Sequence, residues 1–159
     1  MKNILLISPD SIFLNSVIID ICEKLNMFYL DIEKAFVYSI GNKEEVKSIC
    51  GIDYLIKQEK NVINSLCLYE NTVATINSQT AVFYDVFDIL SETYNIYYLS
   101  IKKSILQFLN KKYNKQQKND INILVESEIK NYIKNKNIKT IKIDSADSLQ
   151  EDILKEINV

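Results

Sequence analysis

The sequence predicts an α/β protein in which a five-stranded parallel sheet is covered by helices on both faces. Five short apolar stretches of strand length are spaced along the 159 residues, at 3–8, 27–31, 72–76, 95–99 and 139–143. The segments between them are longer and have apolar residues at helical spacing. Strands that alternate with helices form right-handed βαβ units, and the helices of such units cover both faces of a parallel sheet.

The first and third stretches are expected in the interior of the sheet. Residues 3–8 (NILLIS) and 72–76 (TVATI) are apolar or β-branched over nearly their whole length. A strand that is buried on both faces has this continuous pattern, whereas a strand with one face in solvent alternates between apolar and polar residues.

Amphipathic helices are predicted between the strands. In segment 12–25, one helical face carries Phe13, Val17, Ile21 and Leu25. Comparable helical spacing occurs in 53–68, 101–110 and 147–157. The strongly polar stretch 110–120 (NKKYNKQQKND) predicts a mobile, lysine-rich loop.

Composition favours one globular domain that spans residues 1–159. The chain is 47% hydrophobic and 25% charged, and it has only two glycines and one proline, so no flexible linker divides it. A net charge of −2 gives no electrostatic signal for nucleic acid or for an anionic membrane surface. We expect neither class of partner.

The cysteines and the amino terminus indicate a cytoplasmic protein. Cys22, Cys50 and Cys67 are widely spaced and the chain has no histidine, so no metal site is expected. Reduced thiols are typical of the cytoplasm. The apolar run 4–7 is too short for a signal peptide or a membrane span.

Ligands of parallel α/β sheets bind at the carboxyl ends of the strands, so the loop after the first strand is the first candidate site. Residues 8–16 (SPDSIFLNS) lie between a predicted strand and a predicted helix. They have the position and length of a phosphate-binding loop, whose pattern is G-x-x-x-x-G-K-[ST].

At this point the chain resembles the shikimate kinases. The segment 29–33 (YLDIE) is similar to the family's F-x-D-x-D, 51–59 has the spacing of G-E-x-x-F-R-x-x-E, and 73–78 (VATINS) is similar to V-A-T-G-G-G. Glu128 and Tyr132 stand at the arginine and tyrosine of R-x-P-x-Y. The resemblance implies a P-loop-kinase-like three-layer sandwich with strand order 2-3-1-4-5.

The resemblance also shows which chemistry is missing from the loop. The three glycines of the family's loop fall on Ser8, Ser11 and Phe13, and its lysine falls on Leu14. Glycines let backbone N–H groups surround the phosphates, and the lysine neutralises the β- and γ-phosphates. Pro9 removes one N–H group as well.

The substrate side departs from the family independently. In the family, arginines grip the carboxylate of shikimate through a planar, bidentate fork. Those positions are Ile56 and Glu128 here, and arginine is absent from the whole chain. Glu128 would place a negative charge against a carboxylate, so shikimate kinase activity is not expected.

The surviving candidate residues are vestigial. Asp31 and Glu33 match the acids that the family uses for magnesium and for the substrate hydroxyl, although acids in this position also cap helices. The remains of the phosphate loop are Ser8, Ser11, Asn15 and Ser16. The remains of the substrate pocket are Glu59, Thr75, Asn77, Ser78 and Glu128. For Glu59, a solvated helix face is the simpler expectation.

Three functional hypotheses follow. The first is a catalytically inactive, shikimate kinase-like protein that acts as an interaction or regulatory module through an unknown protein partner. The second is a small-molecule kinase with an atypical phosphate loop, which would need ATP and Mg²⁺ and would use Asp31, Glu33 and Ser16. The third is a sensor of a small uncharged metabolite, held by Ser8, Ser11, Asn77 and Ser78. Under the first and third, no cofactor is expected.

Overall fold

The computed structural model describes residues 2–9, 13–112 and 122–157. Its centre is a sheet of five parallel strands in the order β2-β3-β1-β4-β5. The strands are β1 (Asn3–Ser8), β2 (Phe28–Asp31), β3 (Thr72–Asn77), β4 (Tyr94–Ile101) and β5 (Lys139–Ile143). The predicted fold class, strand positions and strand order are therefore confirmed.

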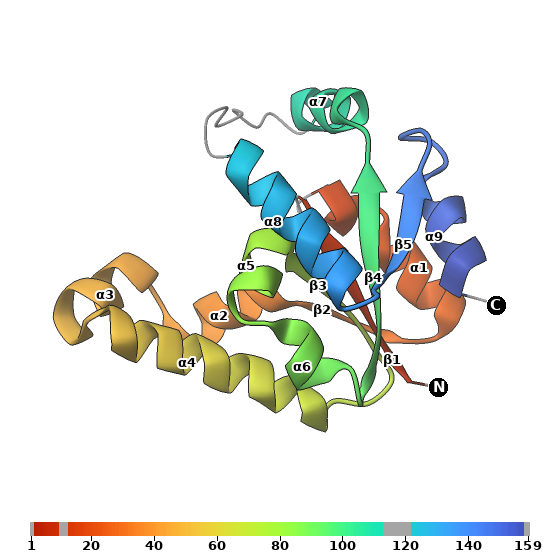
Figure 1. The fold of residues 1–159 in the computed structure, drawn as a ribbon. Helices are drawn as coiled ribbons and strands as arrows, with labels where there is room; N and C mark the ends of the chain where they lie inside the picture. Colours follow the sequence, from red (N-terminus) through yellow and green to blue (C-terminus); the bar gives the residue numbers. More distant parts are fainter. Residues whose placement is uncertain (1, 10–12, 113–121, 158–159) are drawn as a thin grey trace.

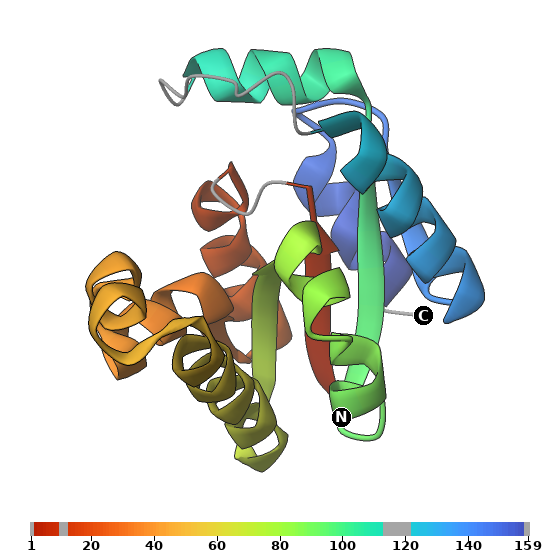
Figure 2. The same cartoon turned by 60° about the vertical axis from the view of Figure 1, so that its left-hand side comes forward.

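Two layers of helices cover the sheet (Figure 1, Figure 2). One face is covered by α1 (Ile18–Leu25) and α9 (Leu149–Ile157). The other face is covered by α2 (Ile32–Ile40), α4 (Ile52–Ser65), α5 (Ser78–Phe83), α6 (Val86–Leu90) and α8 (Asn122–Asn135). Within the described ranges, no helix is long and apolar enough to cross a membrane.

The central strand β1 supplies both cores. All six of its residues are buried. Because side chains alternate along a strand, Leu5 and Ile7 pack beneath α2, α4, α5, α6 and α8, whereas Ile4 and Leu6 pack beneath α1 and α9. This double burial explains why residues 3–8 are continuously apolar.

Two elements lie outside these layers. Helix α3 (Lys43–Cys50) has no buried residue and extends away from the sheet together with the start of α4 (Figure 1). Helix α7 (Lys103–Lys112) lies beyond the carboxyl end of β4 (Figure 1). Of the polar stretch 110–120, residues 110–112 belong to α7, and the rest lies outside the described residues.

The predicted helix 12–25 is corrected by the structure. A 3₁₀ turn, η1 (Phe13–Ser16), comes first, and the α-helix begins only at Ile18. The buried residues of this segment are Leu14, Ile18, Ile21 and Cys22. Of the predicted face, Ile21 is buried, and Val17 and Leu25 are partly buried against the same core. The predicted face is thus confirmed in part, and the change from 3₁₀ to α geometry brings Leu14, Ile18 and Cys22 into the core beside it.

Candidate functional site

The carboxyl ends of β1, β2 and β3 meet at one edge of the sheet. Ser8 at the end of β1 is in register with Asn77 at the end of β3, and Thr75 of β3 is in register with Asp31 of β2. The fold therefore brings together candidate residues from three predicted segments. Ser11 lies outside the described residues, and Ser16 ends the turn η1.

Leu14 points into the core rather than toward the strand ends. Its exposed fraction is 0%, and it belongs to the apolar cluster that includes Ile18 and Ile21 of α1 and Leu99 of β4. Removal of this leucine side chain from water stabilises the folded state. The residue that aligns with the family's lysine is thus a core residue in this chain.

A hydrogen-bond network around Tyr29 joins the loop after β1 to β2 and β3. The Tyr29 hydroxyl donates to Oδ1 of Asn15 at 2.6 Å and is hydrogen-bonded to Oγ1 of Thr75 at 3.1 Å. Burial raises the pKa of Tyr29 to about 12, so the hydroxyl remains a neutral donor at physiological pH. Tyr29 is not among the site residues predicted from the sequence, because a tyrosine within a strand is ordinarily a packing residue.

Asp31, the last residue of β2, and Glu33, in the first turn of α2, both accept hydrogen bonds from protein groups. Asp31 is the N-cap of α2, and its Oδ1 accepts from the backbone N–H of Lys34 at 3.2 Å. Glu33 accepts at Oε1 from the Thr80 hydroxyl of α5 at 2.8 Å. Asp31 thus satisfies the start of its own helix, and Glu33 ties α2 to α5.

Glu59 lies in a buried cluster instead of on a solvated helix face. Its exposed fraction is 8%. It accepts a hydrogen bond from the Tyr84 hydroxyl, and Oε1 lies 2.5 Å from Nζ of Lys43. The same Nζ lies 4.6 Å from the centre of the Phe36 ring. Burial, and then the contact with Glu59, raise the pKa of Tyr84 well above its usual range.

Asn77 and Ser78 begin helix α5. The Asn77 side chain accepts from the backbone N–H of Gln79 at 2.8 Å, which makes Asn77 the N-cap. Ser78 is buried. The Asn77 carboxamide oxygen therefore caps the first turn of α5.

Glu128 is exposed on α8. Tyr132, on the same helix, is hydrogen-bonded to the turn between α5 and α6. The Tyr132 hydroxyl donates to Oδ1 of Asp85 at 2.9 Å and accepts from the backbone N–H of Phe87 at 3.0 Å. Asp85 has a left-handed backbone, with φ of 47°, at the turn between α5 and α6. Tyr132 therefore fixes α8 to this turn.

No metal-binding cluster is apparent in the part of the chain that the structure describes, where no three histidine, cysteine, aspartate or glutamate side chains converge. Among the same residues, every buried side-chain nitrogen or oxygen has a hydrogen-bond partner. The polar groups at the strand ends are therefore hydrogen-bonded mainly to one another and to the backbone at helix starts.

No protein-family model matches the sequence, and no curated protein matches it at a significant level. Solved structures do match over almost the whole chain. The shikimate kinase of Aquifex aeolicus has a TM-score of 0.72 at 17% identity, covering 98% of this chain and 96% of that one. The shikimate kinase of Acinetobacter baumannii, solved with shikimate, has a TM-score of 0.68 at 18% identity, covering 99% and 93%.

A gluconokinase from Sinorhizobium meliloti is also similar, with a TM-score of 0.63 at 13% identity and coverage of 99% of this chain and 91% of that one. Likeness at these identities establishes the fold and not the activity. The chain has a shikimate kinase-like fold, as its motif spacing predicts.

Proposed function

We propose that this chain is a non-catalytic protein with a shikimate kinase-like fold, which acts by binding and not by phosphoryl transfer. The burial of Leu14 carries the proposal. Phosphoryl transfer needs a positively charged group next to the transferred phosphate, and the resemblance assigns that group to the position of Leu14. A fully buried leucine supplies no charge and faces away from the ligand edge.

The acceptor side supports the same proposal. The position of the first substrate arginine is the half-buried Ile56, and that of the second is Glu128. Glu59 is already paired with Lys43 and Tyr84. A carboxylate substrate would find no guanidinium fork at these positions.

A protein partner is the kind of ligand we favour. Large apolar side chains are exposed on α2, on α3 and at the start of α4: Val37, Tyr38, Ile49, Ile52 and Tyr54. Tyr38 is 88% exposed. Large apolar side chains exposed on neighbouring helices are typical of interaction surfaces.

Calorimetry of ATP with and without Mg²⁺ tests the non-catalytic part of the proposal, together with a coupled assay of shikimate turnover. We expect ATP to bind no tighter than about 1 mM, or about −4 kcal/mol, and we expect no turnover. Magnesium-dependent binding in the micromolar range, or measurable turnover, would favour a kinase with an atypical loop instead.

A further inference from the structure

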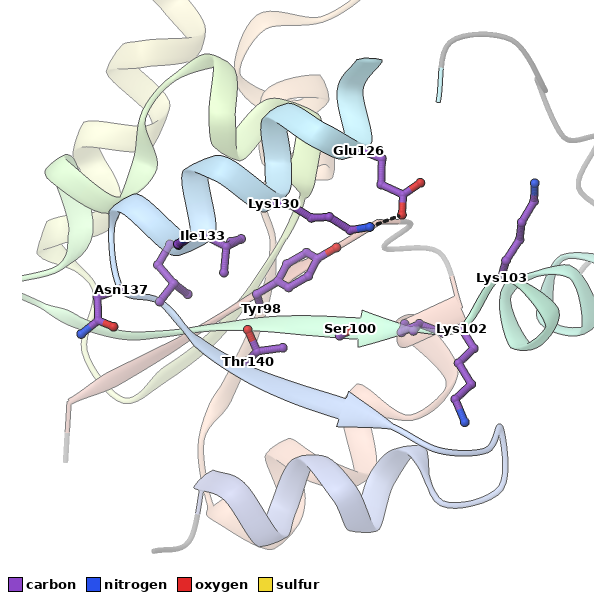
Figure 3. Close-up of a pocket in the computed structure, with 12 residues that line it drawn as sticks. Tyr98, Ser100, Lys102, Lys103, Glu126, Lys130, Ile133, Asn137 and Thr140 are labelled. Carbon is purple, nitrogen blue, oxygen red and sulfur yellow. Dashed lines mark ion pairs between the residues drawn. The ribbon is translucent and has the colours of Figure 1, made fainter. Parts of the chain in front are cut away.

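A basic groove lies between α8 and the part of the sheet formed by β4 and β5 (Figure 3). Its volume is about 560 Å³, within the range of pockets that hold small molecules. Its floor is formed by β4 and β5, and α8 and the start of α7 form its sides. It therefore combines two stretches of the chain, 98–103 and 126–140.

Lysine predominates among the charged residues of the groove. Among the lining residues that the structure describes, four are lysines, Lys102, Lys103, Lys130 and Lys134, and one is an acid, Glu126. Glu126 and Lys130 form an ion pair with an Oε1–Nζ distance of 3.0 Å (Figure 3). For the other three lysines, the described part of the chain offers no ion-pair partner. The groove is thus positive on a chain whose net charge is −2.

Two further features add positive potential. In β5, Lys142 is in register with Ser100. Ile141 and Ile143 pack on the α1 and α9 side of the sheet, so the Lys142 side chain lies on the opposite side, which α8 covers. Helix α7 begins at Lys103 and has no acid in its first turn. The positive end of its dipole therefore adds to the charges of Lys102 and Lys103 and is not offset by a carboxylate.

The groove also has neutral donors and apolar surface. Tyr98, Ser100 and Thr140 contribute hydroxyl groups, and Ile133 and Ile138 contribute apolar walls. In Figure 3 the Tyr98 ring rises from β4 toward α8, with its hydroxyl toward the Glu126–Lys130 pair. A ligand with both an anionic group and an apolar body would match this lining.

We propose that this groove binds a small phosphorylated molecule, with its phosphate among the lysines and its apolar body against Tyr98. The volume suits a small molecule better than a polymer, and hydroxyl and ammonium donors are the usual partners of phosphate oxygens. This proposal is independent of the strand-end site and of whether ATP binds there.

The test is a titration of the isotope-labelled full chain with phenyl phosphate and with inorganic phosphate, followed by amide chemical shifts. We expect phenyl phosphate to bind more tightly than phosphate, and to shift amides of Ser100, Lys102 and Lys134 more than those of Asp31 and Asn77. Equal affinity for the two probes, or shifts confined to the strand ends, would overturn the proposal.

Charge variants sharpen the test. The double variant Lys103→Gln/Lys134→Gln should bind phenyl phosphate about fivefold more weakly, with a loss that shrinks as salt rises. The matched control Lys57→Gln/Lys60→Gln removes the same charge from exposed positions of α4, away from the groove. Equal weakening in both double variants would show that only net charge matters and would refute the site.

An acid variant should act in the opposite direction. Glu126→Gln removes the negative charge of the groove and releases Lys130 from its ion pair. We expect phenyl phosphate to bind about threefold more tightly to it. Glu23→Gln, on exposed α1 surface beneath the other face of the sheet, should leave the affinity unchanged. No gain for Glu126→Gln relative to Glu23→Gln would contradict the proposal.

Discussion

Replacing Leu14 by lysine would test the observation on which the proposed function rests. In a working phosphate loop this change would restore the family's residue, whereas in this structure it places an ammonium group in an apolar core. Removing a fully buried leucine side chain forfeits about 1.5–3 kcal/mol of burial. Burying the lysine ammonium in the core, or moving it out to water by displacing part of the core, costs further free energy. We therefore expect Leu14→Lys to lower the free energy of unfolding by at least about 3 kcal/mol.

Thermal and urea unfolding would measure this loss. For a chain of this size, about 3 kcal/mol corresponds to a fall in Tm of roughly 6–12 °C. Leu14→Met, which nearly conserves volume, should cost less than about 1.5 kcal/mol. Leu68→Lys is the matched control, because Leu68 is 83% exposed, and it should change stability by less than about 0.5 kcal/mol. If Leu14→Lys were as stable as Leu68→Lys and gained ATP affinity, Leu14 would face the ligand edge and our reasoning would be wrong.

Three further predictions concern the polar clusters. Lys43→Met leaves the buried Glu59 carboxylate without its cation and should cost about 2 kcal/mol in urea unfolding, against less than about 0.5 kcal/mol for the exposed control Lys57→Met. Tyr29→Phe removes the bonds to the loop and to β3 and should cost about 1–3 kcal/mol; a negligible loss would show that the network is dispensable. Burial opposes ionisation of Asp85, but its hydrogen bonds hold its pKa below the usual range, so its stabilisation is present at neutral pH and is lost in acid. In urea unfolding measured from neutral to acidic pH, the free energy of unfolding of Asp85→Asn should therefore fall less with decreasing pH than that of the unmodified chain.

The sheet could be predicted from the sequence because its central strands are continuous runs of apolar or β-branched residues. Residues 3–8 are apolar throughout because both faces of β1 are covered, and 72–76 has the same cause. Helix α2 was missed because it begins directly after Asp31 with no intervening loop. Helix α3 buries no residue, so it has no apolar stripe to recognise.

The chemistry of the candidate site was less predictable, because it depends on contacts that are distant in sequence. Glu59 is buried by Lys43, which precedes it in a helix without a pattern, and by Tyr84, which follows it in a short helix. The inward direction of Leu14 depends on a 3₁₀ turn that shifts the helical face. Spacing alone placed these residues near the strand ends but did not give their orientation.

Helix α3 has a consequence for the dynamics of the molecule. A helix that buries none of its side chains loses little when it opens, so its amide hydrogens should exchange with solvent far sooner than those of β1. Lys43, at the start of this helix, is partly exposed and forms an ion pair with the buried Glu59 of α4. We therefore expect α3 to exchange its amide hydrogens by local opening while the sheet stays folded, and we expect Lys43→Met to make this opening more frequent.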